Sequence, residues 1–328
     1  MEALEPESAL VRETALRLGF DAVGIASADE SIGEDFARYR SFVESGYHGG
    51  MSYMAQHLPV RESVSGPGIL PGAKSVICVM QRYRVKPRID SQPVSELGSQ
   101  GIVHRIAKFA RGLDYHNHMR RKLRKLASFV RSLEPGATAR PLVDSAPMLE
   151  RAWAVRAGLG FVGKNGMLIR PGMGSFTVLG EVVTSVRLVP DSPLDGAIAQ
   201  RCGGCDACVR ACPTGALVRP WVLDARRCVS YLTIEHRGPW EGVPAVSPWL
   251  FGCDLCQDCC PYNRVVGAWV GGGGPFDPLS RWCSTSLEDL ERASREEMEE
   301  LMRGSPLRRV RFEDWGRNVV GAGGRVGD

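Results

Sequence analysis

Two short stretches carry related cysteine spacings: RCGGCDACVRACP over residues 201–213 and LFGCDLCQDCCPYN over residues 250–263. The first has cysteines at positions 202, 205, 208 and 212, and Pro213 follows the last of them. The second, aligned on its own Cys-Pro, has cysteines at positions 260, 256 and 253, but Leu250 stands where the next would fall. Because residues 201–263 hold nine of the eleven cysteines, this region determines what the chain can bind.

This spacing is typical of bacterial ferredoxins, in which three thiolates hold one [4Fe–4S] cluster and the fourth binds the other cluster. Two clusters need eight thiolates, and the two stretches supply seven in register. The eighth is either Cys228 or Cys259, and we favour Cys228 because Cys259 aligns with Ala211. The crossed pattern then predicts one cluster on Cys202, Cys205, Cys208 and Cys260, and a second on Cys212, Cys228, Cys253 and Cys256.

Structural zinc sites and disulfides are the alternative interpretations of these cysteines. Zinc also takes Cys-x2-Cys pairs, but it needs neither the third cysteine of the run nor the terminal Cys-Pro. Disulfides form in oxidising compartments, whereas the sequence starts with the acidic stretch MEALEPE and shows no apolar leader. We therefore expect a cytoplasmic protein in a reducing compartment, where clustered cysteines indicate metal binding.

The bulk composition is that of an ordinary globular protein. The 328 residues are enough for two domains, and 44% hydrophobic and 24% charged residues are normal values. No apolar run of roughly eighteen residues is present, so we expect no membrane association.

The formal charge of +4 does not by itself indicate a nucleic-acid partner. One basic cluster is either a solvated helix face or an anion-binding surface, and it consists of Arg120, Arg121, Lys122, Arg124 and Lys125.

Helix and strand patterns are mixed in the region before the cysteines, which predicts an α/β (α+β) domain. Cys78 falls in a β-rich run and is expected to be a buried small hydrophobic residue. The sequence Ser294-x2-Glu297 predicts a capping box at the start of a helix near the C-terminus. The expected helices lie at 8–18, 33–45, within 102–131 and at 148–157, and the expected strands at 20–26, 75–81 and 176–186.

Two features of this first region suggest chemistry. Asp144 follows a short apolar strand and precedes the expected helix at 148–157, so it is either a helix N-cap or a functional carboxylate. The segment GLGFVGKNG, residues 158–166, has glycines that allow either an ordinary turn or a close backbone approach to a flat or anionic group. His116 and His118 lack a second ligand at i, i+4, so hydrogen-bonding or surface roles are expected for them.

Several longer motifs together resemble the epoxyqueuosine reductase family over about residues 19–263. They are DYH at 114–116, VDSAPMLER at 143–151, AGLGFVGKN at 157–165, CVSYLTIE at 228–235, and GCDLC at 252–256 with the following Cys260-Pro261. The resemblance implies a cobalamin-binding domain similar to the nitroreductase-like fold at residues 1–195. It further implies a ferredoxin-like domain with two [4Fe–4S] clusters at 196–270 and a short helical C-terminal extension at 271–328.

The resemblance also implies an activity. Members of this family use cob(II)alamin and two [4Fe–4S] clusters to deoxygenate epoxyqueuosine to queuosine at the wobble position of tRNA. The expected partners are therefore the tRNA anticodon loop, with the basic cluster at 120–125 as the RNA-binding face, and an external electron donor such as a flavodoxin or ferredoxin. We expect a monomer.

Residue roles follow from the matched motifs. The family's cluster ligands fall on the eight cysteines grouped above, and its proton donor falls on Asp144. To hold a proton near neutral pH, Asp144 must be desolvated so that its pKa rises above the ordinary value of about 3.9. The expected cofactor-binding residues are Arg61, Asp144, Lys164, Asn165, Ser175 and Gly252.

Two other classes share part of the pattern. A corrinoid reductive dehalogenase would have the same cofactors, but those enzymes usually carry a twin-arginine leader, which residues 1–15 do not contain. A non-enzymatic electron-transfer protein would have the clusters but no need of Asp144 or of a cofactor-sized first domain.

Overall fold

The computed structural model describes residues 5–83, 101–196, 201–240, 246–264 and 274–323. The chain divides into two compact units, which are described separately. The first consists of Met1–Gly46, Ser52–Arg82 and His116–Cys205, and the second of Tyr47–Met51, Tyr83–Tyr115 and Asp206–Asp328. No helix in the described ranges combines the length and the hydropathy needed to cross a bilayer.

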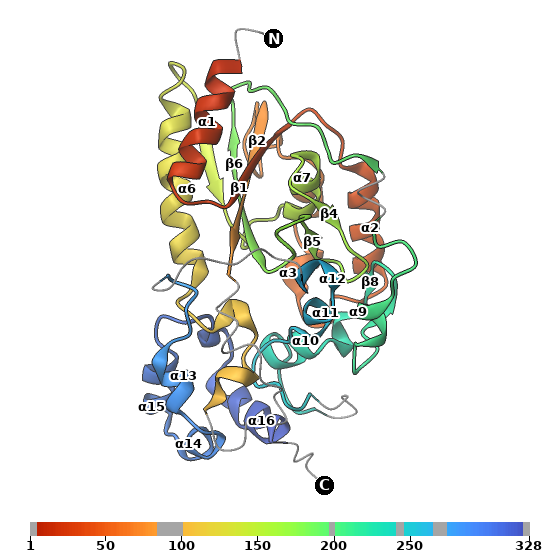
Figure 1. Ribbon diagram of the computed structural model, residues 1–328, viewed down its shortest axis with the longest axis vertical. Helices are drawn as coiled ribbons and strands as arrows, with labels where there is room; N and C mark the ends of the chain where they lie inside the picture. The colour runs from red at the N-terminus through yellow and green to blue at the C-terminus, as the bar shows by residue number, and fades with distance from the viewer. Residues whose placement is uncertain (1–4, 84–100, 197–200, 241–245, 265–273, 324–328) are drawn as a thin grey trace. The chain divides into compact units, whose positions relative to one another are not determined.

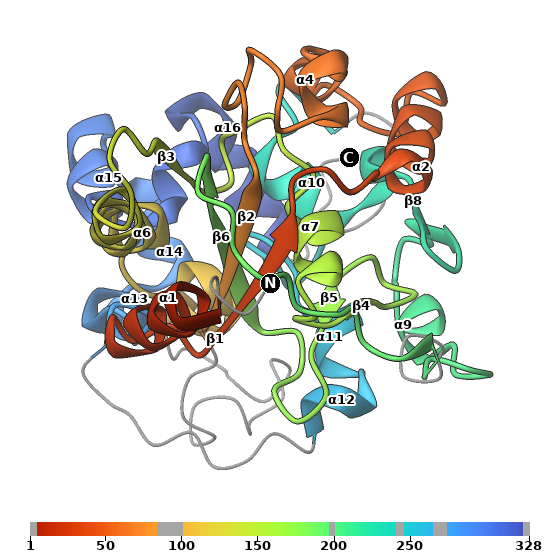
Figure 2. The same cartoon turned by 90° about the horizontal axis from the view of Figure 1, so that it is seen from above.

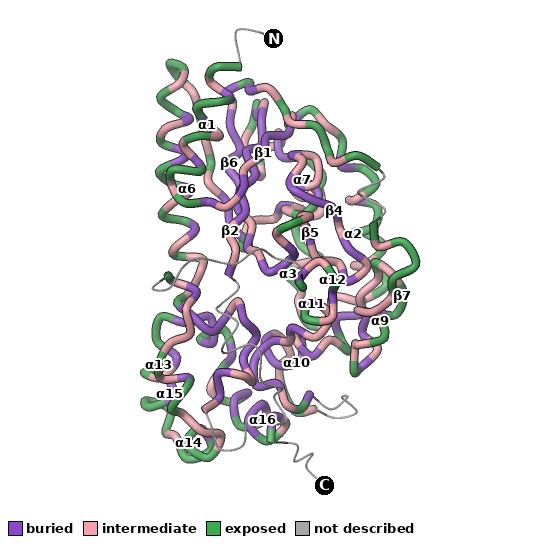
Figure 3. Tube along the Cα trace, viewed as in Figure 1, coloured by how far each residue is buried: buried purple, intermediate pink, exposed green. Residues whose placement is uncertain are grey.

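A four-stranded antiparallel sheet in the order β1-β2-β6-β3 forms the centre of the first unit (Figure 1). The β-branched and apolar runs predicted from the sequence become β1, β2 and β6, which are buried along most of their length, whereas only Leu142 of β3 is buried (Figure 3). The strands are β1 (Ala22–Ser27), β2 (Ser75–Arg82), β3 (Ala139–Leu142) and β6 (Thr177–Thr184).

Helices cover both faces of this sheet. Helices α1 (Glu5–Arg17) and α6 (Tyr115–Arg131) lie on one face and α7 (Glu150–Arg156) on the other, as the view from above shows (Figure 2). On the α6 face, a Cβ at Gly180 of β6 would lie 2.8 Å from Leu123 Cδ1. On the α7 face, the core includes Cys78, Trp153 and Val183, and full burial of Cys78 confirms its predicted place.

The remaining elements of the first unit are short. Helix α2 matches the predicted helix at 33–45, and a two-stranded ribbon holds the glycine-rich segment at 158–166. The bounds are α2 (Gly33–Glu44), α3 (Ser52–Ala55), α4 (Leu58–Glu62), β4 (Phe161–Val162) and β5 (Leu168–Ile169).

In the second unit each cysteine stretch forms a short helix, α9 (Ala207–Arg210) in the first and α11 (Leu255–Asp258) in the second. Helix α10 (Val229–Ile234) begins directly after Cys228. The other elements here are 3₁₀ turns η3 (Ile102–Arg105), η4 (Lys108–Ala110) and η5 (Ala225–Arg227), strands β7 (Leu217–Arg219) and β8 (Val222–Leu223), and helix α12 (Pro261–Arg264).

The C-terminal part of the second unit is helical. Ser294 accepts the backbone N–H of Glu297, and the Glu297 carboxylate accepts that of Ser294, so the predicted capping box is confirmed. Ser286 and Asp289 form a second box of the same kind. The elements are α13 (Ser280–Ser284), α14 (Leu287–Arg292), α15 (Arg295–Met302), η6 (Pro306–Arg309) and α16 (Phe312–Ala322).

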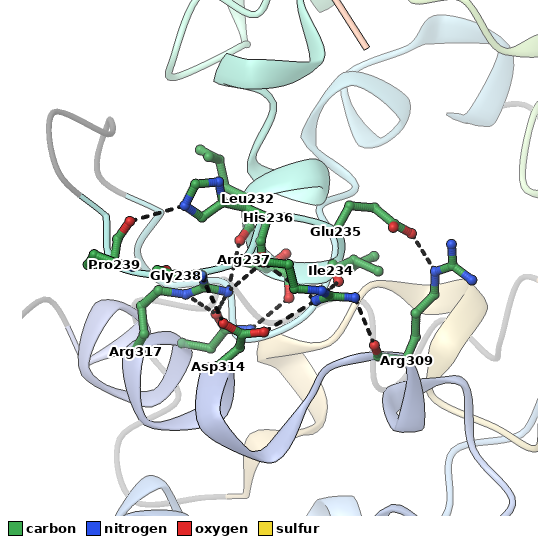
Figure 4. A network of polar contacts seen from close by, with 12 residues as sticks. Leu232, Ile234, Glu235, His236, Arg237, Gly238, Pro239, Arg309, Asp314 and Arg317 are labelled. Atoms are coloured by element: carbon green, nitrogen blue, oxygen red, sulfur yellow. Dashed lines mark hydrogen bonds and ion pairs between the residues drawn. The ribbon is translucent and has the colours of Figure 1, made fainter. Parts of the chain in front are cut away.

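A buried polar network joins α16 to the end of α10 (Figure 4). The Asp314 carboxylate accepts the backbone N–H of Gly238 at 3.2 Å and pairs with the guanidinium groups of Arg237 and Arg317 at 3.5 and 3.4 Å. Asn318, one turn further along α16, donates to the carbonyl oxygens of Thr233 and Leu250. The C-terminal helices are therefore anchored to the chain that leads from Cys228 to Cys253.

The basic amphipathic helix expected within residues 102–131 is confirmed. It begins at Tyr115, in the sequence Asp114-Tyr115-His116 expected at its entrance, and residues 102–110 form η3 and η4. Ile102 and Ile106 still bury their apolar side chains there. At Gly112 a Cβ would lie 2.3 Å from the carbonyl oxygen of Pro275, so the chain makes a close backbone contact just before the helix starts.

The close contact between β1 and the end of α7 requires a glycine at position 24, because any Cβ there would clash. A Cβ at Gly24 would lie 1.9 Å from the carbonyl oxygen of Ala157. We predict that Gly24→Ala lowers the free energy of unfolding by about 1–3 kcal/mol or more, because α7 must move away from the sheet. Urea unfolding followed by circular dichroism measures the loss. Gly66→Ala is the control, because its Cβ would meet its nearest atom at 3.8 Å. Equal unfolding midpoints for the two variants would contradict this account of the close approach.

Candidate functional site

Four cysteines of the second unit lie within electrostatic range of one another. Burial raises the pKa of Cys253 to about 12, and the nearby thiols of Cys228 and Cys212 add to the shift. Burial likewise raises the pKa of Cys256, with contributions from Cys253 and Cys228. These thiols do not converge on a single-ion site among the described residues, but a [4Fe–4S] cluster takes its four thiolates around a larger core. The donor set suits such a cluster, whose iron would stabilise the buried thiolates.

Cys259 has different neighbours. Burial raises the pKa of its thiol to about 11, and the next contributions come from Cys208 and Cys260, which the sequence assigns to the other cluster. Charge interactions therefore link Cys228 with Cys253 and Cys256, although Cys256 also receives a contribution from Cys208. The assignment of individual ligands stays a prediction. None of the eleven cysteines, all of which are in the described ranges, forms a disulfide with another.

A buried ion pair holds the second cysteine stretch in place. Lys108 and Asp254 are 6% and 1% exposed. The Lys108 backbone N–H donates to Asp254 Oδ2 at 2.7 Å, and its ammonium group lies 3.7 Å from the same carboxylate and 2.6 Å from that of Asp258. Because Asp254 follows Cys253 directly, these contacts fix the backbone that presents Cys253 and Cys256.

The glycine-rich segment of the first unit contacts the first cysteine stretch. The Lys164 ammonium group donates to the carbonyl oxygens of Gly203 at 2.6 Å and Cys205 at 2.8 Å. Asn165 is buried and accepts the backbone N–H of Met167 at 3.1 Å, and Ser175 is buried as well. Of the expected cofactor-binding residues, Lys164 thus contacts the backbone of Cys205, which the sequence predicts to be a cluster ligand.

Arg61 and Gly252 were the other expected cofactor contacts. Arg61 donates to the carbonyl oxygen of Tyr53 at 3.2 Å and stacks over the Tyr39 ring at 5.3 Å. Gly252, in the second unit, has a left-handed φ of 71° and donates to Thr233 Oγ1 at 2.9 Å. A Cβ at position 252 would lie 2.6 Å from the Ala107 side chain, so packing against Ala107 requires a glycine at this position.

Asp144 lies in a turn between β3 and α7. The N-cap of α7 is Leu149, so the interpretation of Asp144 as the helix cap is wrong. Its φ of 48° lies in the left-handed region. This conformation costs a non-glycine residue about 1–3 kcal/mol and is found most often at functional sites. The carboxylate is 54% exposed, and its Oδ2 lies 2.8 Å from His116 Nε2 in the first turn of α6.

Two further carboxyls near Asp144 were not singled out from the sequence. Glu150 Oε1 accepts the backbone N–H of Asp144 at 2.7 Å, and Glu181 lies in the middle of β6 with no exposed surface. The sequence does contain a feature that marks each of these residues. Glu150 belongs to the motif at 143–151, and Glu181 interrupts an apolar run. His116 was expected to be a hydrogen-bonding or surface residue, and its partner could not be identified from the sequence.

The mixed α/β fold and the paired cysteine stretches define an iron–sulfur oxidoreductase. The sequence pattern described as "4Fe-4S double cluster binding domain" matches residues 201–263, and the pattern described as "Epoxyqueuosine reductase QueG, DUF1730" matches residues 67–145. Epoxyqueuosine reductase of Gloeobacter violaceus is 38% identical over 334 residues, which cover 99% of this chain and 98% of that protein. The chain belongs to the epoxyqueuosine reductase family.

Solved structures of this family have the same fold. An epoxyqueuosine reductase in complex with an epoxyqueuosine-modified tRNA-Tyr stem loop superposes with a TM-score of 0.83 at 29% identity, over 98% of this chain and 81% of that one. The Bacillus subtilis epoxyqueuosine reductase, with an aspartate-bearing catalytic loop swung out of its active site, gives 0.83 at 29% identity, over 98% and 82% of the two chains.

We predict that Lys108→Met lowers the free energy of unfolding by about 3–5 kcal/mol, because it leaves the Asp254 carboxylate buried without its cation. The control is Arg38→Ala, which removes the pairs of an exposed guanidinium with Glu34 and Asp35 and should cost about 0–1 kcal/mol. Urea unfolding of both variants provides the comparison. A loss for Lys108→Met no larger than for Arg38→Ala would show that the buried pair does not stabilise this segment.

The ligand assignment predicts different iron contents for two cysteine variants. Cys228→Ala should lose iron from the second cluster, because one of its four thiolates is gone, whereas Cys259→Ala should keep the iron of two full clusters. Iron and sulfide analysis after anaerobic reconstitution measures both. Full iron in Cys228→Ala together with depleted iron in Cys259→Ala would reverse the assignment.

Proposed function

We propose that the protein reduces epoxyqueuosine to queuosine at the wobble position of tRNA, with cob(II)alamin and two [4Fe–4S] clusters as cofactors. The observation that carries this proposal is the match over nearly the full length to a relative named epoxyqueuosine reductase. The cysteine grouping in the second unit supports the clusters. The related structure with an epoxyqueuosine-modified stem loop supports tRNA as the substrate.

In this proposal the chain has three parts. Residues 1–195 form the cobalamin-binding catalytic domain with a nitroreductase-like fold, and residues 196–270 form the ferredoxin-like domain. Residues 271–328 are a helical extension. The protein acts as a cytoplasmic monomer and receives electrons from an external donor such as a flavodoxin or ferredoxin.

The first unit has groups suited to a corrin. Arg61 Nε is buried and has no hydrogen-bond acceptor among the described residues, so a carboxamide of the corrin periphery can satisfy it. Lys164, Asn165, Ser175 and Gly252 are proposed to bind the same cofactor. When bound, cobalamin would supply a metal centre that takes up single electrons and transfers them to the substrate.

Asp144 is the proposed proton donor. Deoxygenation of an epoxide to an alkene breaks two C–O bonds and consumes two electrons and two protons, and the oxygen leaves as water. A carboxylic acid at the departing oxygen supplies one of these protons and thereby prevents a high-energy alkoxide. His116, 2.8 Å from Asp144 Oδ2, orients that carboxyl and can return a proton to it after turnover.

The basic face of α6 is the proposed RNA-binding surface. Arg120, Arg121, Arg124 and Lys125 are exposed along this helix and can neutralise phosphates. Lys122 serves the fold instead, because its ammonium group donates to the carbonyl oxygen of Gly19 at 2.8 Å and to Gln81 Oε1 at 2.7 Å.

The test of this function is turnover by the anaerobically reconstituted protein, with an epoxyqueuosine-containing tRNA stem loop and a low-potential electron donor. Nucleoside mass spectrometry should find queuosine. Asp144→Asn should bind both clusters and cobalamin and yet lose turnover by about a hundredfold or more, because the amide cannot donate the acid proton. Unchanged turnover in Asp144→Asn would remove this residue from the chemistry, and a protein that binds iron but no corrinoid would refute the proposed function.

A further inference from the structure

A carboxyl pair lies beneath the Asp144 turn, at the centre of the sheet. Glu181 is in register with Cys78 of β2 on one side and with Leu142 of β3 on the other. Alternation along β6 points its side chain to the face covered by α7, where Glu150 begins the helix. The Glu150 and Glu181 carboxyl groups interact electrostatically there.

The position of Glu181 requires a proton. An ionised carboxylate can only accept hydrogen bonds, and burying both of its oxygens without a donor is costly, so the protonated carboxyl is favoured. Both oxygens of Glu181 are buried, and no N–H group or hydroxyl of the described residues donates to them. The Glu150–Glu181 pair therefore shares a proton, as closely placed carboxyls in buried sites do.

The surroundings favour the protonated form. Burial, followed by the charge of Asp144, raises the pKa of Glu150 to about 7. Burial and the charge of Glu150 raise the pKa of Glu181 well above its ordinary value. Arg151 is the cation whose charge acts in the opposite direction on Glu150, but it donates to the carbonyl oxygen of Gly166. From β2, the pair faces the thiol of Cys78, whose pKa is also raised by burial.

The pair is joined to Asp144 in two ways. Glu150 Oε1 accepts the Asp144 backbone N–H at 2.7 Å, which holds the residue in its left-handed conformation. A negative charge on the pair also repels a charge on the Asp144 carboxyl, since Coulombic interactions between two groups are mutual.

We propose that the Glu150–Glu181 pair is a positioning device for Asp144, which fixes the Asp144 turn through Glu150 and keeps the Asp144 proton in place until the epoxide oxygen takes it. This inference rests on the proposed function of Asp144 as proton donor. Glu150 and Glu181 do not touch the reacting atoms in this mechanism, and their effect passes through Asp144.

The first test measures the shared proton without turnover. A protonated carboxyl C=O band in the infrared spectrum of the purified protein should persist above neutral pH and disappear in Glu181→Gln. Glu134→Gln, which changes an exposed carboxyl of the first unit, should leave the band unchanged. A spectrum without this band in the wild type, or with the same band in Glu181→Gln, would overturn the proposal that the Glu150–Glu181 pair holds a proton.

The pH dependence of stability gives a second measurement. The folded-state pKa of Glu150, about 7, lies above its ordinary value of 4.5, so the folded state retains a proton that the unfolded state releases. This contribution is fully present below pH 4.5 and is lost as the pH rises towards 7. The wild type should therefore lose stability relative to Glu150→Gln over this window, and a constant difference in melting temperature would contradict the raised value.

The third test measures the effect on catalysis. Glu150→Ala should lower kcat by about tenfold to a hundredfold with KM unchanged, because the Asp144 turn loses its acceptor. Glu150→Gln retains an acceptor oxygen and should recover most of kcat, but the inflection near neutral pH should vanish from its pH profile. Iron and corrinoid contents equal to those of the wild type exclude a folding defect.

The outcomes separate the two proposals. A wild type that turns over the stem loop, an inactive Asp144→Asn and a Glu150→Ala with normal kcat would overturn the positioning role alone. A wild type without turnover under any condition would refute the proposed function, and the infrared and stability measurements would still decide whether the pair shares a proton.

Discussion

The antiparallel ladder between β2 and β6 is the interaction on which the first unit depends. It runs from the pair Ser75–Thr184 to the pair Arg82–Thr177. Both strands are almost entirely buried, so a side chain between them and the covering helices must be apolar or hydrogen-bonded. The ladder fixes Glu181 where its carboxyl cannot reach water, and α7 supplies Glu150 as the partner. The centre of the sheet, the start of α7 and the Asp144 turn are therefore one connected arrangement.

In the second unit the cysteine-bearing segments are held by contacts that do not involve metal. Lys108 fixes the chain at Asp254, Thr233 accepts the backbone N–H of Gly252, and Asn318 ties the Thr233 and Leu250 carbonyls to α16. These contacts hold the backbone around Cys228, Cys253 and Cys256 without using the cysteine thiols. Such preorganisation lowers the conformational entropy that cluster assembly must otherwise overcome.

Local signals in the sequence were enough for much of the fold. The strands followed from β-branched runs, and the helix start at Ser294 followed from its capping box, because each signal lies within a few residues. The start of α6 at Tyr115 agrees with the sequence, which places residues 114–116 at the entrance of that helix, whereas the 3₁₀ turns at 102–110 did not follow from it. Glu150 and Glu181 were missed because their pairing is a tertiary contact, which periodicity along one segment does not encode.

The contact of Lys164 with the Gly203 and Cys205 carbonyls has a consequence for assembly. Cys205 belongs to a segment that a cluster would order, and Lys164 belongs to the segment proposed to bind the corrin. Two ligands that order the same contact are thermodynamically linked, and such linkage is reciprocal. Damage to the cluster by oxygen would then weaken corrin binding as well, so the two cofactors would be lost together and regained together.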